Sequence, residues 1–456
     1  MATSLHDDLI AAVATPPGQG GIGVIRLSGK GAADVARIIC NQTLVPRHAT
    51  YCKFSDGDEV LDEGIAIAFA GSASYTGEEV VELQGHGGPV VLQRLLDLVC
   101  RHGARLARPG EFSERAFLNG KLDLAQAEAV ADLISSSSVA AARAAVRSLQ
   151  GDFSNEVHRV AEHLAKLRVL VEACIDFPDE DVEFLQTGQV TERLQQGIDQ
   201  LQQLRRDSVQ GQLLNEGASV ALLGAPNAGK SSLLNVLSGE EAAIVTDIPG
   251  TTRDLLKIDL LLDGLPLRLV DTAGLRDSAD KVEQMGVARA KAQAQQADLL
   301  LIVVDATAVA ATDMDTFVSN LLDDVGVELD QLPAIVVFNK IDLLPGLNSR
   351  CASRFNVVAV SALQGTGLAE LRGEIKSSLG FDNSESGFIA RARHVAALDL
   401  ALGHLIEAKQ LIVLGEATEI AAEEMRFAHN ALGEIVGTVT PDDLLGRIFS
   451  EFCIGK

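Results

Sequence analysis

The sequence contains no tryptophan and only two tyrosines among its 456 residues. Proteins that bind single-stranded nucleic acids stack bases on aromatic rings, so this class of protein is disfavoured. Basic residues are also in deficit, with 38 Lys and Arg against 63 Asp and Glu, and the formal net charge is -25. The chain as a whole therefore has no positive field, and any contact with nucleic acid requires a local basic surface or a partner.

Paired cysteines and long apolar segments are missing as well. The six cysteines form no Cys-x-x-Cys pair and no metal-ligand spacing, which is typical of free thiols in a reducing compartment. Apolar runs such as Leu299–Val304 are far too short to span a bilayer. The first ten residues include acids and lack the basic stretch of a secretory signal. We therefore expect a cytoplasmic protein without a membrane partner.

The remaining composition is that of a globular protein, and the length favours about two to four domains. Proline and glycine are frequent near the N-terminus and give way to long stretches with helical periodicity. A segment that alternates short apolar strands with amphipathic helices interrupts these stretches, as in a parallel sheet covered by helices. The predicted domains are mixed α+β over residues 1–120, helical over 121–216 and 381–456, and inserted α/β over 217–380.

Individual elements are predicted from the same patterns. Strand-like runs in the first domain are Gly23–Leu27 and Gly64–Phe69. Helical spacing covers Leu122–Leu133, Val139–Leu149, Val157–Cys174 and Val190–Leu204. The strands of the inserted domain are Ser219–Leu223, Leu267–Val270, Leu299–Val304, Ile335–Phe338 and Val357–Val360.

Residues 224–231 have the sequence Gly-Ala-Pro-Asn-Ala-Gly-Lys-Ser, which matches the P-loop pattern G-x-x-x-x-G-K-[ST]. In this motif backbone N–H groups surround the phosphates, the lysine (Lys230) reaches the β and γ oxygens, and the serine (Ser231) binds Mg²⁺. A predicted strand precedes the motif and a predicted helix, Ser232–Leu237, follows it. A glycine-rich turn of no function is the alternative, and it does not account for this strand–loop–helix context.

Three shorter motifs follow, each at the end of a predicted strand. Residues 271–274, Asp-Thr-Ala-Gly, can hold Mg²⁺ through water and sense the γ-phosphate. In the motif Asn-Lys-Ile-Asp, Asp342 can accept two hydrogen bonds from an edge that guanine has and adenine lacks, and Lys340 can lie over the base. The backbone of Ser361-Ala362 can reach the guanine carbonyl. Together the motifs predict a site for GTP rather than ATP.

The loop between the first two motifs is a candidate switch. Thr252, in the sequence Gly-Thr-Thr-Arg-Asp, is the natural second Mg²⁺ ligand, and a polar loop is the alternative. Asn227 inside the P-loop either shapes that loop or holds a monovalent cation with carbonyls of residues 246–251, in the role of an arginine finger.

The residue that orients the hydrolytic water is not obvious. Many GTPases place glutamine directly after the Asp-x-x-Gly motif, but this chain has Leu275, which cannot orient water. Glu283 is the best candidate, with Asp277 and Asp280 nearby, and a solvated carboxylate on a helix is the alternative. The residues predicted to bind GTP are Asn227, Ala228, Gly229, Lys230, Ser231, Ser232, Thr246, Asp247, Ile248, Pro249, Gly250, Thr251, Thr252, Asp271, Thr272, Ala273, Gly274, Asn339, Lys340, Asp342, Ser361 and Ala362.

Longer motifs outside the inserted domain point to one family. They are residues 15–18 (Thr-Pro-Pro-Gly), 20–26 (Gly-Gly-Ile-Gly-Val-Ile-Arg), 82–89 (Glu-Leu-Gln-Gly-His-Gly-Gly-Pro), 108–119 (Arg-Pro-Gly-Glu-Phe-Ser-Glu-Arg-Ala-Phe-Leu-Asn) and 453–456 (Cys-Ile-Gly-Lys). With the P-loop and the split helical domain, the chain resembles the MnmE family of tRNA-modifying GTPases, also called TrmE, over essentially its whole length.

The resemblance implies a function for the N-terminal domain, which in this family is folate-binding and mediates homodimerisation. A 5-formyltetrahydrofolate-type cofactor would be held by residues matching Arg26, Glu82, Lys121 and Lys456. Cations suit the glutamate tail of a folate, and a carboxylate can accept from the pterin N–H groups. Cys453 is a further candidate for the catalytic site, with a packing role as the alternative.

The resemblance also implies a reaction. The partner is MnmG, which uses flavin and NADH in a heterotetramer, and the pair adds an aminomethyl or carboxymethylaminomethyl group to C5 of the wobble uridine of certain tRNAs. GTP domains of two chains pair when K⁺ and nucleotide are bound. The K⁺ ligands match Asn227, Thr246, Ile248 and Thr251, and Glu283 matches the residue that orients water.

Two other functions stay open from the residues alone. The GTPase motifs are shared with switches that assemble ribosomes, and a folate-like domain with an acidic chain also fits one-carbon transfer to a protein. A basic face for tRNA is not evident. Candidates are Arg143, Arg147, Arg391 and Arg393, with solvated helix faces as the alternative.

Overall fold

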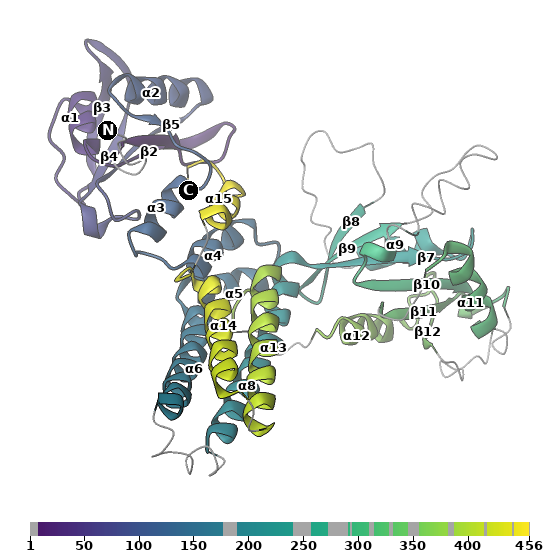
Figure 1. Cartoon of the computed structure of the whole chain (residues 1–456). Coiled ribbons are helices and arrows are strands. Elements are labelled where there is room, and N and C mark those ends of the chain that lie inside the picture. The colour runs from purple at the N-terminus through teal and green to yellow at the C-terminus, as the bar shows by residue number, and fades with distance from the viewer. Residues whose placement is uncertain are drawn as a thin grey trace. The chain divides into compact units, whose positions relative to one another are not determined.

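The structure is a computed structural model that describes residues 8–176, 189–239, 257–271, 291, 294–309, 314–327, 332–344, 355–381, 387–414, 417–439 and 442–455 (Figure 1). The chain divides into two compact units. The first comprises residues 1–134, 148–201 and 397–456, and the second comprises residues 135–147 and 202–396. Two of the boundaries fall inside the long helices α8 (Gln189–Glu216) and α13 (Ala392–Leu414).

The first unit contains a six-stranded sheet with the order β3-β4-β5-β2-β1-β6. All neighbouring strands are antiparallel except β1 and β6. Helices α1 (Ala32–Cys40) and α2 (Pro89–Arg101) cover one face, where Ile25, Phe54 and Leu83 are fully buried. The strands are β1 (Ile10–Val13), β2 (Gly20–Ser28), β3 (Thr50–Asp56), β4 (Glu59–Phe69), β5 (Val80–Gly87) and β6 (Arg105–Leu106).

The second face of this sheet is only partly covered. Ile10 and Ala12 on β1 pack with Phe112 of helix α3 (Glu111–Leu118) and with Tyr75. Farther along the same face, Tyr51 on β3 lies opposite Ile65 on β4, and these side chains are 67% and 39% exposed. Within the described residues these two side chains are a candidate surface for association.

The helices of the first unit pack along apolar seams. On α6 (Asp152–Asp176) the buried apolar residues recur at alternating steps of four and three, and they are Phe153, Val157, Val160, Leu164, Leu167 and Val171. This spacing places them on one side of a helix, and α14 (Thr418–Val436) packs against α6. The remaining helices of this unit include α4 (Leu124–Ser135) and α15 (Asp442–Ser450), whose apolar residues share one cluster.

The second unit contains a six-stranded sheet with the order β12-β11-β10-β7-β9-β8, parallel except for β8. Helices α9 (Lys230–Gly239) and α12 (Leu368–Ser378) pack on one face and α11 (Met314–Val325) on the other, so the sheet is buried on both sides. The strands are β7 (Ala218–Leu223), β8 (Lys257–Leu262), β9 (Leu265–Asp271), β10 (Leu299–Asp305), β11 (Ala334–Asn339) and β12 (Asn356–Val360).

The predicted fold class is confirmed: an α+β N-terminal domain and a helical domain split by a parallel-sheet insert. The predicted strands of the insert lie in β7, β9, β10, β11 and β12, and the predicted helices lie in α4, α5 (Val139–Leu149), α6 and α8. Strand β8 was missed, although the Asp263-Gly264 turn that joins it to β9 has positive φ at both residues, as a two-residue hairpin requires. In the described part of the chain no helix is both long and apolar enough to cross a membrane.

Candidate functional site

The parallel strands of the second unit end at a common edge. The register pairs Leu222 with Asp271, and it pairs Asp305 with Asn339 at the ends of β10 and β11. Ligands of parallel α/β sheets bind outside this carboxyl edge, where strand order reverses. The ends of β7, β9, β11 and β12, which the predicted GTP motifs reach or follow in the sequence, therefore lie at one edge of the sheet.

The P-loop joins β7 to α9 and depends on two glycines. Gly224 and Gly229 have φ of +153° and +98°, and a Cβ on Gly229 would lie 2.2 Å from Nδ2 of Asn339. Asn227 has φ of +63°, a left-handed conformation that Asn tolerates better than most residues. The loop is thus shaped so that backbone groups rather than side chains line it, as phosphate binding requires.

Lys230 is the first residue of α9 and is buried, with 6% of its surface exposed. Its Nζ donates to the carbonyl oxygens of Gly224 (2.6 Å) and Ala225 (2.9 Å). A buried ammonium needs such acceptors, and they hold the charge inside the curve of the loop. Ser231 and Ser232 follow in the first turn of α9 and are exposed. A serine hydroxyl there has the chemistry of a Mg²⁺ ligand.

Asn339 connects the P-loop to the last predicted motif. It is 1% exposed, its Nδ2 donates to the Ala228 carbonyl (3.0 Å), and its Oδ1 accepts from the backbone N–H of Ala362 (3.1 Å). The Ser361 hydroxyl donates to Oδ1 of Asp342 (2.6 Å). Asn339 and Ser361 thus hold the phosphate-binding loop and the predicted base-binding residues in one network.

Lys340 and Asp305 form an ion pair at the same edge. Lys340 Nζ lies 2.6 Å from Oδ2 of Asp305, and Oδ1 of Asp305 accepts from the backbone N–H (2.9 Å) and hydroxyl (2.7 Å) of Thr307. Partial burial acts to raise the pKa of Asp305, but the hydrogen bonds from Lys340 and Thr307 hold it below its usual value. Asp305 was not among the sequence-predicted residues.

Several predicted residues lie outside the described part of the chain. They are Thr246, Asp247, Ile248, Pro249, Gly250, Thr251, Thr252, Thr272, Ala273, Gly274, Glu283 and Lys456. Asp271 is described only as the final residue of β9. The switch, most K⁺ ligands and the residue proposed to orient water therefore stay predictions.

In the first unit, β2 and β5 bring Arg26 and Glu82 opposite one another. Arg26 donates to Oε1 of Glu82 from Nε (3.0 Å) and Nη2 (2.9 Å), and its Nη1 donates to the Gly455 carbonyl (3.4 Å). The guanidinium lies over the rings of Tyr75 and Phe112, at 5.7 and 5.8 Å from their centroids. Burial raises the pKa of Tyr75, whose hydroxyl is within 2.9 Å of the Ser113 hydroxyl. A carboxylate can accept hydrogen bonds from a pterin, a guanidinium can donate them, and aromatic rings can stack on it. These residues therefore have the chemistry to hold a pterin.

The other predicted folate and tRNA residues are placed less closely together. Lys121 Nζ donates to the Ser72 carbonyl (2.9 Å), which is a separate contact from the Arg26 pair. Cys453 is exposed, and its carbonyl accepts from the Gly110 N–H (3.4 Å). Of the candidate tRNA residues, Arg143 and Arg147 are exposed, whereas Arg391 and Arg393 are partly buried.

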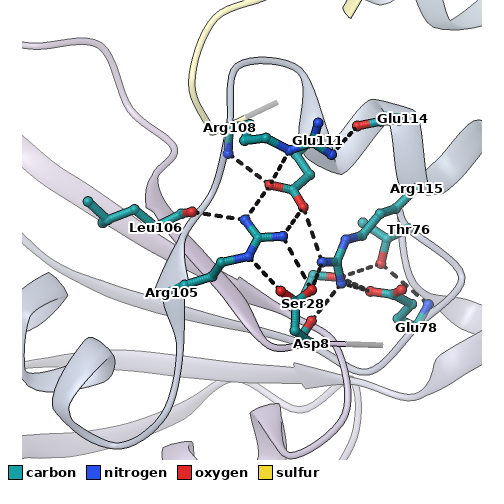
Figure 2. A network of polar contacts seen from close by, with 10 residues as sticks. All are labelled: Asp8, Ser28, Thr76, Glu78, Arg105, Leu106, Arg108, Glu111, Glu114 and Arg115. Atoms are coloured by element: carbon teal, nitrogen blue, oxygen red, sulfur yellow. Dashed lines mark hydrogen bonds and ion pairs between the residues drawn. The ribbon is translucent and has the colours of Figure 1, made fainter. Parts of the chain in front are cut away.

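Residues of α3 form an ionic network with Asp8, Glu78 and Arg105 (Figure 2). Arg115 and Glu111, each 1% exposed, face one another at 3.2 Å on α3, next to Phe112 and Ser113. Arg115 also contacts Glu78 (3.0 Å) and Asp8 (2.7 Å). Burial acts to raise the pKa of Glu111, but hydrogen bonds from Arg105 and the Arg108 backbone lower it below its usual value. Sequence reasoning missed this network, although the spacing Glu-x-x-x-Arg on α3 signals an ion pair.

The fold and the motifs together define a GTP hydrolase of the P-loop class. Comparison with known proteins narrows the class. The profile described as MnmE helical domain matches residues 124–453, and that described as GTP-binding protein TrmE N-terminus matches residues 9–121. The chain belongs to the MnmE family of tRNA modification GTPases.

Relatives named tRNA modification GTPase MnmE match over nearly the full chain. Those of Erwinia tasmaniensis and Pectobacterium carotovorum are each 51% identical, covering 99% of this chain and 100% of theirs. Among solved structures, a GTP-binding protein from Sulfolobus solfataricus in complex with GDP is 20% identical, covers 49% of this chain and 67% of its own, and has a TM-score of 0.28. That value is too low to inform the fold.

Proposed function

We propose that this chain is a K⁺-stimulated GTPase that acts with the flavoprotein MnmG to modify C5 of the wobble uridine of certain tRNAs. The group added is an aminomethyl or carboxymethylaminomethyl group, and its one-carbon unit comes from a 5-formyltetrahydrofolate-type folate. The observation that carries the proposal is family membership over the whole chain, together with a P-loop that Asn339 connects to Ala362, next to the hydrogen-bonded pair Ser361 and Asp342.

The nucleotide would be held by the residues at the carboxyl edge of the second sheet. Lys230 exchanges its bonds to the Gly224 and Ala225 carbonyls for the β and γ oxygens of GTP, because a phosphate is the stronger acceptor. Asp342 accepts from the guanine edge while Ser361 fixes its carboxylate. Ser231 and Thr252 would hold Mg²⁺, which neutralises charge on the phosphates.

Hydrolysis would depend on residues of the loops that follow. Asn227 in the P-loop, with Thr246, Ile248 and Thr251, would hold K⁺, which supplies positive charge beside the phosphates. Glu283 would orient the attacking water, since Leu275 occupies the position where many GTPases have glutamine. The GTPase domains of two chains would pair to bring these groups together.

The N-terminal domain would bind the folate and form the homodimer. Arg26, Glu82, Lys121 and Lys456 would contact the cofactor, with Tyr75 and Phe112 beside Arg26. The folate supplies the one-carbon unit, and the ionic network of Arg115 keeps the aromatic residue of α3 in place. Dimerisation is supported by the sheet face of Tyr51 and Ile65, which is left uncovered within the described residues. Cys453 is a further candidate near this site.

Nucleoside analysis tests the proposal directly. The gene is deleted in its native host, total tRNA is digested, and C5-aminomethyl-type uridines are measured by mass spectrometry. Their loss, restored by the wild type and by Glu370→Ala but not by Glu283→Ala, is the expected result. Glu370→Ala is the matched control, because it removes an exposed carboxylate on α12 of the same unit that has no proposed role. Unchanged nucleosides would redirect the assignment to ribosome assembly or to a protein substrate.

The cation and the folate are tested on the purified chain. GTP turnover in KCl should exceed turnover in an equal concentration of NaCl, and Asn227→Ala should remove the difference. Equal turnover in the two salts would refute the K⁺ role. Saturable binding of a reduced folate should be lost in Arg26→Ala and retained in Arg94→Ala, whose ion pair with Glu59 is exposed.

A further inference from the structure

We propose that Asp305 is a positioning residue for guanine nucleotides, because it anchors the ammonium of Lys340 so that the lysine stem covers the base. The proposal rests on the proposed nucleotide site and adds a residue that none of the sequence motifs contains. Asp305 ends β10 and lies opposite Asn339, which ends β11, so the ion pair joins two neighbouring strand ends.

The contacts of Asp305 leave its carboxylate little freedom. One oxygen accepts from the Thr307 N–H and hydroxyl, and the other is 2.6 Å from Lys340 Nζ. The side chains of Asp305 and Lys340 are 20% and 33% exposed, so the pair is less screened than one in bulk solvent. Because Thr307 already fixes the carboxylate of Asp305, this side chain loses little further conformational entropy when it contacts Lys340. Asp305 can therefore act as an anchor for the ammonium.

The backbone at Lys340 shows why an anchor is useful. Lys340 has φ of +68°, a left-handed conformation that is unfavourable for a residue with a side chain. It turns the chain from β11 into the short helix η2 (Ile341–Leu343), which contains Asp342. The ion pair therefore fixes the side chain of Lys340. It also steadies the backbone that leads to Asp342, whose carboxylate is proposed to contact guanine. Without the anchor, both contacts to the base lose their preorganisation.

A double-mutant cycle tests whether Asp305 acts through Lys340. The variants are Asp305→Asn, Lys340→Met, which keeps an apolar stem without the ammonium, and the double variant, with the affinity for a fluorescent GDP analogue as the readout. Each single variant should weaken binding by about three- to tenfold. The double variant should be no weaker than the single ones, because both remove the same ion pair.

The control is Asp298→Asn, the same chemical change just before the start of β10, where Asp298 accepts from the Ser219 N–H (2.8 Å). It should leave GDP affinity unchanged. Wild-type affinity in Asp305→Asn would overturn the inference, and so would losses that add in the double variant, because Asp305 would then act independently of Lys340. If Asp305→Asn fails to fold, unchanged GDP affinity in Lys340→Met would also overturn the inference. Absence of GDP binding by the wild type would instead refute the proposed nucleotide site.

Discussion

Replacement of Arg115 by methionine should destabilise the N-terminal domain strongly. The guanidinium is 1% exposed and donates to the Asp8 carbonyl and to the carboxylates of Asp8, Glu78 and Glu111. Methionine fills much of the volume but leaves Glu111, which is 1% exposed, and the partly buried Glu78 without their bonds to this guanidinium. Removing one partner of a buried ion pair costs about 3–5 kcal/mol. We expect the lower end, about 3 kcal/mol, because Arg105 still contacts Glu111 at 2.5 Å.

The chain provides its own probe for this measurement. It has no tryptophan, and its two tyrosines, Tyr51 and Tyr75, both lie in the N-terminal domain. Tyrosine fluorescence during urea unfolding therefore reports on that domain alone. The control is Arg94→Met, which breaks an ion pair with both side chains more than half exposed and should cost at most about 1 kcal/mol. An equally small loss of unfolding free energy in Arg115→Met and Arg94→Met would refute the conclusion that the network stabilises the domain.

The same network predicts an acid dependence. Burial acts to raise the pKa values of Asp8 and Glu111, but hydrogen bonds from arginines hold both below their usual range. A carboxylate with a depressed folded-state pKa stabilises the fold above its unfolded-state pKa and loses that contribution as pH falls through the folded-state value. Stability of the wild type should therefore fall below about pH 4, and the fall should be smaller in Arg115→Met. An equal fall in both would exclude these carboxylates as the cause.

Three further predictions concern the other parts of the chain. Gly229→Ala places a Cβ 2.2 Å from the Asn339 amide at a φ of +98°. The affinity for GDP, measured by titration, should therefore drop at least about tenfold. An unchanged affinity would show that the loop relaxes. Asp342→Asn should weaken GTP binding, and unchanged binding would contradict its contact with the base. Leu164→Ala, at a position 1% exposed on α6, should lower unfolding free energy by about 2–5 kcal/mol in a circular dichroism melt, and a smaller loss would mean that the seam repacks.

The sequence predicts best what depends on local patterns. Strand β10 was found because a parallel strand buried on both faces is continuously apolar, and the P-loop was found because phosphate binding fixes residue types at fixed spacing. Strand β8 is an edge strand, and its charged residues Lys257 and Asp259 weaken the apolar signal. The Asp-Gly turn that follows it was the one local signal in the sequence that indicates a hairpin, and hence this strand.

Contacts between distant segments were beyond the local patterns. Asp305 has no motif of its own, and its role depends on β10 and β11 ending side by side. Tyr75 and Phe112 reach Arg26 from a loop and a helix, and only the folded domain shows them together. The residues named for folate came from the family resemblance alone, and the structure brings two of them, Arg26 and Glu82, into contact.

The bond between Arg26 and the Gly455 carbonyl spans 429 residues of sequence. A ribosome adds about 5–20 residues per second, so roughly 20–90 s separate the synthesis of these two residues. The N-terminal sheet can form early, but its Arg26 site is finished only after residue 455 has been made. A nascent chain in which residue 455 has not yet been made would therefore carry a proposed cofactor site that lacks this carbonyl.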